Sequence, residues 1–67
     1  MEMIVVNGEK RPLPARGTVA ALLGELGLTG RRIAVERNGE IVPRSRHDTE
    51  ALAPGDRLEI VVAVGGG

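Results

Sequence analysis

The segment Leu58-Glu59-Ile60-Val61-Val62-Ala63-Val64 runs directly into Gly65-Gly66-Gly67. Apolar residues recur at every second position from Leu58, which is the pattern of a β-strand with one buried face. The three glycines that follow extend roughly 10 Å, at about 3.3–3.6 Å per residue. Because glycine has no Cβ, such a segment passes through channels that reject other residues. The segment predicts a strand that carries a slim tether with a carboxylate at its end, and a linker or frayed terminus is the alternative.

The composition limits what this chain can do. Its 67 residues form one small domain, with nine basic and nine acidic side chains and no Cys, Phe, Tyr or Trp. Disulfides and thiolate metal sites are excluded, and base stacking on aromatic side chains is excluded as well. No apolar stretch has the length of a signal peptide or a membrane span, so we expect a cytoplasmic location and no nucleic-acid or membrane partner.

The first part of the chain predicts a hairpin. The apolar run Met3–Val6 is followed by Asn7-Gly8, a pair that tolerates the positive φ angles of a two-residue turn. A second strand is expected over residues 10–13. It contains Pro12, which lacks a backbone donor, so this strand belongs at a sheet edge.

A single helix is expected next, over residues 19–26. Thr18 is placed to cap its N-terminus and Gly27 to end it. One face of this helix is apolar and consists of Val19, Leu22, Leu23 and Leu26.

The remaining residues predict three more strands. A strand over residues 33–37, the turn Asn38-Gly39 and a short strand over 40–42 form a second hairpin, and the longest strand covers 57–64. The fold class is therefore α+β, with a mixed sheet of about five strands and one helix on one face. Residues 1–64 form the domain and residues 65–67 form the tail.

An exposed apolar stripe is expected on the uncovered face of this sheet. The first strand is apolar on both faces, which is typical of a central strand, so we place it beside the last strand. Val61 and Ala63 then face outward together with Met3 and Val5, the pair we favour over Ile4 and Val6. With Val64, these residues are the predicted docking site for a partner protein, and scattered surface apolarity is the alternative.

No catalytic or metal site is apparent in the sequence. His47 is the single histidine and there is no cysteine, so a zinc site is not expected. The few hydroxyl side chains have no plausible base beside them. No set of residues in the sequence could run a catalytic cycle alone, so we do not expect an enzyme.

Three segments resemble a known family: residues 35–44 (VERNGEIVPR), residues 52–61 (LAPGDRLEIV) and the ending Val64-Gly65-Gly66-Gly67. The element order resembles the ubiquitin-like β-grasp fold, and these segments are similar to the thiamine-biosynthesis sulfur carriers of the ThiS family. The resemblance covers essentially the whole chain. Gly65 departs from many members, which have a longer side chain before the glycine pair.

The resemblance implies that the chain is a carrier protein and a co-substrate of partner enzymes. A partner adenylyltransferase would use ATP and magnesium to activate the carboxylate of Gly67, and the carrier itself would bind no cofactor. A sulfur donor such as a cysteine desulfurase would then convert it to a thiocarboxylate for thiazole synthase. Gly65 and Gly66 would be the tether. The alternatives are a carrier for molybdopterin or cysteine synthesis, a ubiquitin-like modifier, and a binding module with an inert tail.

Overall fold

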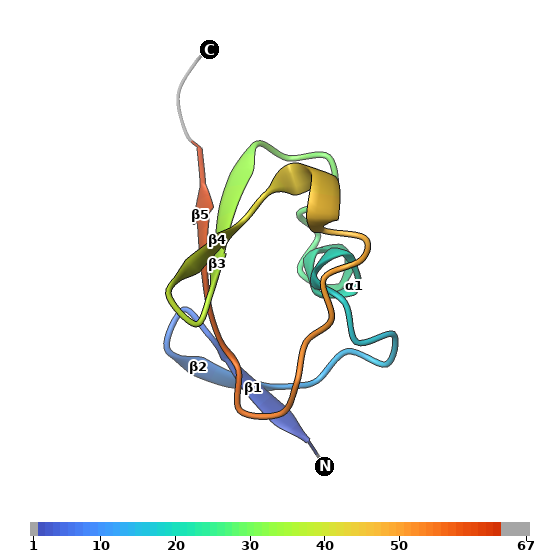
Figure 1. Ribbon diagram of the computed structural model, residues 1–67, viewed down its shortest axis with the longest axis vertical. Helices are drawn as coiled ribbons and strands as arrows, with labels where there is room; N and C mark the ends of the chain where they lie inside the picture. The colour runs from blue at the N-terminus through green and yellow to red at the C-terminus, as the bar shows by residue number, and fades with distance from the viewer. Residues whose placement is uncertain (1, 64–67) are drawn as a thin grey trace.

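Strands β1 (Met3–Val6) and β5 (Arg57–Val62) lie side by side and parallel at the centre of a five-stranded sheet (Figure 1). The computed structural model describes residues 2–63, so the predicted boundary between domain and tail lies outside the described residues. The strand order is β2-β1-β5-β3-β4, and every neighbouring pair apart from β1 and β5 is antiparallel. Strand β3 (Ile33–Arg37) lies on the other side of β5, and the edge strands are β2 (Glu9–Pro12) and β4 (Glu40–Val42).

Two Asn-Gly pairs make the hairpin turns. Asn7 and Gly8 have φ angles of 49° and 83°, and Asn38 and Gly39 have 52° and 86°. Positive φ at both central residues matches the right-handed twist of the flanking strands. Both predicted hairpins are confirmed, and β2 lies at a sheet edge as its proline indicated.

Helix α1 (Val19–Glu25) begins where the sequence predicts and ends one residue before the predicted Leu26, which is its C-cap. The Thr18 hydroxyl oxygen accepts a hydrogen bond from the Ala21 N–H at 3.1 Å, and the chain leaves the helix through Gly27 at φ 72°. A short 3-10 helix, η1 (Arg44–Arg46), precedes the loop that returns to β5. The isolated bridge between Thr18 and Ala51 ties this loop to the start of α1.

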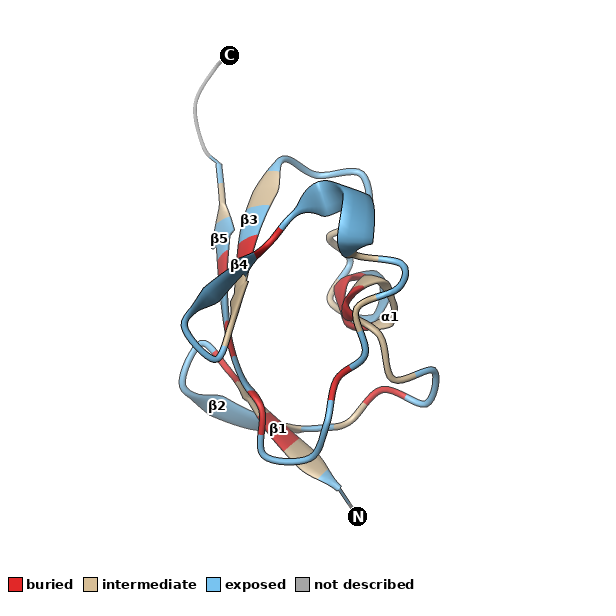
Figure 2. Cartoon of the chain, in the orientation of Figure 1, coloured by how far each residue is buried: buried red, intermediate tan, exposed pale blue. Residues whose placement is uncertain are grey.

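The core lies between α1 and one face of the sheet, where the buried positions of both elements face each other (Figure 2). Its apolar members are Ile4, Val6, Val19, Leu22, Leu23, Val35, Val42, Leu52, Leu58 and Ile60. Their area removed from water is the main stabilising contribution, at about 25 cal/mol per Å². The predicted α+β arrangement, a mixed sheet with one helix on one face, is confirmed.

A polar cluster fixes the start of β5. Asp56, which is 6% exposed, accepts hydrogen bonds from the Ala53 N–H at 2.8 Å, Asn38 Nδ2 at 3.0 Å and Arg37 Nε at 2.7 Å. Arg37 also donates to Glu50 at 3.2 Å. Burial acts to raise the pKa of Asp56, but these donors outweigh it and hold that pKa below its usual value. The hydrogen bond to Asp56 correspondingly raises the pKa of Arg37.

Candidate functional site

Backbone contacts with β3 and with Arg32, the residue before it, hold the end of β5 on one side. Val62 lies opposite Ile33, and the Ala63 N–H donates to the Arg32 carbonyl at 2.9 Å, one residue past the strand. The backbone direction of the chain is therefore fixed as far as Ala63. The predicted carrier residue Gly67, the tether residues Gly65 and Gly66, and Val64 lie outside the described residues.

Asn7 holds the other side of β5. Its Nδ2 donates to the Ile60 carbonyl at 3.0 Å, and its Oδ1 accepts from the Ile60 N–H at 2.7 Å. The side chain thus supplies the two backbone contacts that β1 cannot make once it turns away after Val6. Sequence reasoning assigned Asn7 only to a turn, because no local signal links it to a residue 53 positions later.

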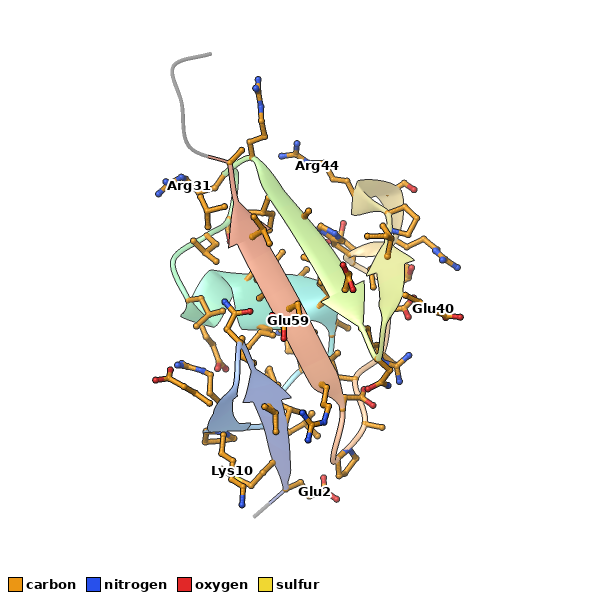
Figure 3. The ribbon with its side chains drawn as sticks, turned by 90° about the vertical axis from the view of Figure 1, so that its left-hand side faces the viewer. Glu2, Lys10, Arg31, Glu40, Arg44 and Glu59 are labelled. Carbon is orange, nitrogen blue, oxygen red and sulfur yellow. The ribbon has the colours of Figure 1, made fainter. Side chains whose placement is uncertain are left out.

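The open face of the sheet carries a compact row of side chains that crosses three strands. Ile41 on β4 lies opposite Glu36 on β3, and Glu36 lies opposite Glu59 on β5. In the next row, Ala34 lies opposite Val61. We call these five residues the outer patch, and Figure 3 shows Glu59 in the middle of this face with α1 behind the sheet.

The two large side chains of the outer patch are well exposed. Ile41 is 61% exposed and Val61 is 64% exposed. The prediction that Val61 and Ala63 face outward is confirmed. Sequence reasoning missed Ile41 and Ala34. The alternation of Ile41 with the buried Val42 was the signal that could have found the first of them.

Met3 and Val5 also face outward, as predicted, and both are half-buried. They do not join Val61 in one stripe, however. Val5 lies opposite Arg57, four residues before Val61 on β5, which corresponds to about 13 Å along the strand. The predicted docking residues therefore form two groups. Met3 and Val5 are one group, and Val61, which belongs to the outer patch, and the neighbouring Ala63 are the other.

Basic side chains gather at the end of the sheet where β5 exits. Figure 3 shows Arg31 and Arg44 there. Together with His47 they line a cavity of about 200 Å³ beside α1. His47 is half-buried, and its Nε2 lies 3.2 Å from the Val42 carbonyl oxygen, so this ring helps to hold the loop after β4.

Neither a metal-binding cluster nor a membrane-spanning helix is found among the described residues. Within residues 2–63, no group of three or more His, Asp and Glu side chains is close enough to hold a metal ion. None of the helices in that range has the length and apolar character needed to cross a membrane. The arrangement consists of a strand whose end is anchored on both sides and an exposed patch beside it. It is suited to holding the residues that follow β5 next to a bound partner.

The comparisons with known proteins point to one family. Residues 4–67 match the model of the ThiS family. The sulfur carrier protein ThiS of Bacillus subtilis is 41% identical over 51 residues, which cover 76% of this chain and 77% of that protein. The crystal structure of the thiamine biosynthesis protein ThiS of Geobacter metallireducens has a TM-score of 0.77 and 29% identity, over 97% of this chain and 99% of that one.

A longer curated protein also matches. The thiazole synthase of Paramagnetospirillum magneticum is 56% identical to this chain over 64 residues. These residues are 96% of this chain, and the chain spans only 20% of the length of that relative.

Proposed function

We propose that this chain, which belongs to the ThiS family, is a sulfur carrier of thiamine biosynthesis that holds sulfur as a thiocarboxylate on Gly67. The observation that carries the proposal is the family match, which extends from residue 4 through the three glycines. The anchored end of β5 supports it, since a carrier arm needs a fixed base.

The proposed chemistry begins with activation of a poor electrophile. A carboxylate oxygen of Gly67 attacks the α-phosphorus of ATP in a partner adenylyltransferase that uses magnesium, and pyrophosphate leaves. The product is an acyl-adenylate, whose leaving group is AMP. This chain supplies no acid, base or metal ligand to the step and acts as a protein-sized substrate.

Sulfur then replaces AMP. The terminal sulfur of a persulfide, carried by a donor such as a cysteine desulfurase, attacks the carbonyl carbon of Gly67 and AMP leaves. The product is an acyl disulfide. A cysteine thiol of a partner cleaves its S–S bond, forms a new disulfide and releases the thiocarboxylate. The partner's thiol sulfur is oxidised as it enters the new disulfide, and its two electrons reduce the sulfane sulfur to the sulfur of the thiocarboxylate.

Thiazole synthase is the proposed acceptor. A thiazole synthase contains a stretch 56% identical to this chain, so a carrier-like sequence and a thiazole synthase occur in one polypeptide there. Such a fusion is expected where two proteins exchange an intermediate. The cytoplasmic location predicted from the sequence is part of the same proposal.

The body of the carrier serves recognition by the adenylyltransferase. The outer patch lies on the uncovered sheet face and includes Val61, one row from the end of β5. A partner seated there would be next to the base of the tether. Met3 and Val5 lie at the far end of the same face and would extend the contact.

The test is a reconstitution followed by intact-mass measurement. The chain is incubated with ATP, magnesium, the adenylyltransferase, a cysteine desulfurase and cysteine. We expect a mass gain equal to the exchange of one oxygen for one sulfur atom, located at Gly67. A variant without Gly66 and Gly67 is the matched control and should gain nothing.

The same assay separates the rival functions. A chain that stays at its original mass under conditions active for another ThiS protein would overturn the proposal. Conjugates of higher mass with target lysines would indicate a protein modifier instead. A thiocarboxylate that thiazole synthase does not consume would indicate a carrier for another sulfur pathway.

A further inference from the structure

Two glutamates lie opposite each other on the open side of the sheet. Glu36 on β3 lies directly opposite Glu59 on β5 in the antiparallel register. Directly opposite residues have Cβ atoms about 4.5–5.5 Å apart, and like charges at such positions are destabilising. Glu36 is half-buried, so water screens its charge less than at a fully exposed position.

The ion pairs of the described chain do not relieve this repulsion. Within residues 2–63 the ion pairs are those of Arg37 with Glu50 and with Asp56, and Arg37 lies on the helix-facing side of β3. Arg57 is on the same face as Glu59, two residues earlier, but makes no ion pair with it. Neither glutamate of this pair therefore has an ion-pair partner among the described residues.

Apolar side chains flank the two carboxylates. Ile41 lies opposite Glu36 on the far side of β3, and Val61 follows Glu59 on the same face of β5. Both are more than half exposed. A concentrated negative charge between two exposed aliphatic side chains combines the two requirements of a docking surface: apolar area to bury and a charge that selects the partner.

We propose that Glu36 and Glu59 together form a receptor for an arginine side chain of the adenylyltransferase, with Ile41 and Val61 packing against apolar residues around it. A guanidinium carries five N–H donors in a planar fork, so one arginine can donate to both carboxylates. Binding would remove the repulsion that the free chain carries. This inference takes the identity of the partner from the proposed function.

A second copy of this chain is a poorer occupant of the same row. Two copies related by a two-fold axis through Glu36 and Glu59 would bring four carboxylates together, since a two-fold interface pairs a surface with itself. The charge therefore favours a partner with a basic side chain at this position.

The test compares binding with stability. Glu36→Gln and Glu59→Gln keep the shape of each side chain and remove its charge. Affinity of the full chain for the adenylyltransferase is measured by titration calorimetry at low and high salt, and the unfolding temperature of each free chain is measured separately. We expect each variant to bind about tenfold more weakly or worse, because the arginine loses a buried charged partner. The double variant should lose most of the salt dependence.

The free variants should unfold at the wild-type temperature or above it, because each substitution relieves the repulsion. Two control variants are Glu40→Gln and Arg57→Gln. Glu40 lies opposite Arg37, on the other face, and its substitution makes the same change in net charge. Arg57 is on the outer face but carries the opposite charge. Neither control should weaken binding.

Several outcomes would overturn the inference. Unchanged affinity in both glutamate variants would do so, as would a lower unfolding temperature in both, which would show that the carboxylates serve the fold. Self-association of the wild-type chain that Glu59→Gln abolishes would identify a second copy as the occupant. A wild-type chain that does not bind the adenylyltransferase would overturn the inference and the proposed function together.

The two proposals can also fail separately. If Gly67 acquires sulfur while both glutamate variants bind as tightly as wild type, the carrier function stands and the arginine receptor does not. If binding depends on Glu36 and Glu59 but Gly67 acquires no sulfur, the receptor stands and the carrier function does not.

Discussion

Arg37 and Glu36 are neighbours on β3, yet their surroundings are opposite in character. Arg37 points to the helix side, where it pairs with Asp56 at 2.7 Å and with Glu50 at 3.2 Å. Glu36 points to the open side, where it faces Glu59. On one face of the sheet the charges that meet are complementary, and on the other face like charges meet.

The difference separates what folding requires from what a partner requires. On the helix side, the buried carboxylate of Asp56 finds its hydrogen-bond donors within the chain. The outer patch contributes little to folding, since Ile41 and Val61 remain more than half exposed. Substitutions on the two faces should therefore affect different measurements.

The largest loss of stability is expected at the centre of the buried face. Leu58 is 1% exposed and lies on the central strand. Leu58→Ala removes buried methyl groups and leaves a cavity, which should cost about 2–5 kcal/mol of unfolding free energy in urea denaturation. Val61→Ala, three positions along the same strand on the other face, is the control and should stay within about 0.5 kcal/mol of wild type. Equal losses in the two variants would contradict the separation of the faces.

The second effect concerns the polar cluster at the start of β5. Asp56→Asn keeps the shape of the side chain but weakens the contacts with Arg37 and with the Ala53 N–H. We expect a loss of about 1–3 kcal/mol, because hydrogen bonds to a charged group are lost inside the structure. Thermal unfolding at neutral pH would measure it, and Asp48→Asn, at an exposed loop position, is the control.

The same carboxylate predicts the acid dependence of stability. The pKa of Asp56 is lower in the folded chain than in the unfolded one, where it is about 3.9. Its stabilising contribution is therefore complete above that value and is lost as the pH falls from there through the folded pKa. Urea unfolding of wild type between neutral and acidic pH should show this loss. The loss should be smaller in Asp56→Asn, and identical pH profiles would exclude Asp56 as its source.

A smaller loss of stability is expected when the hydrogen bonds between the Asn7 side chain and the Ile60 backbone are removed. Asn7→Gly keeps a residue that tolerates positive φ at the turn but removes both side-chain hydrogen bonds to Ile60. We expect about 1–2 kcal/mol less stability and faster amide hydrogen exchange at Ile60. Asn38→Gly, at the equivalent position of the other hairpin, is the comparison. In this variant, exchange at Ile60 should change only as much as the overall unfolding free energy changes.

The smallest change in stability is expected on the outer patch. Ile41→Thr keeps a β-branched residue in β4 and replaces an exposed apolar group by a polar one. Unfolding free energy should stay within about 0.5 kcal/mol of wild type, whereas affinity for the adenylyltransferase should fall severalfold. A variant that binds normally would restrict the docking surface to other residues.

Much of the fold could be predicted because its signals are local. The two Asn-Gly turns, the Thr18 cap and Gly27 each determine a φ angle or a hydrogen bond within a few residues, and all are found where expected. The neighbouring positions of the first and last strands were predicted from the first strand, which is apolar on both faces and therefore typical of a central strand.

The candidate site was harder to predict because it depends on register. Nothing in the sequence shows that Val5 lies opposite Arg57, or that Glu36 lies opposite Glu59, since both follow from contacts between segments distant in the chain. A shift of one residue would move every side chain of a strand to the other face. The roles of Gly65, Gly66 and Gly67 stay predictions.

The central position of β5 has a consequence for how the carrier is made. The strand nearest the glycines is also the one on which both halves of the sheet assemble, β1 on one side and β3 on the other. During synthesis from the N-terminus, the two hairpins and the helix emerge first and have no strand to join them. A truncated chain without β5 would therefore lack the strand that joins the two halves of its sheet, so the sheet can be completed only after β5 has been synthesised.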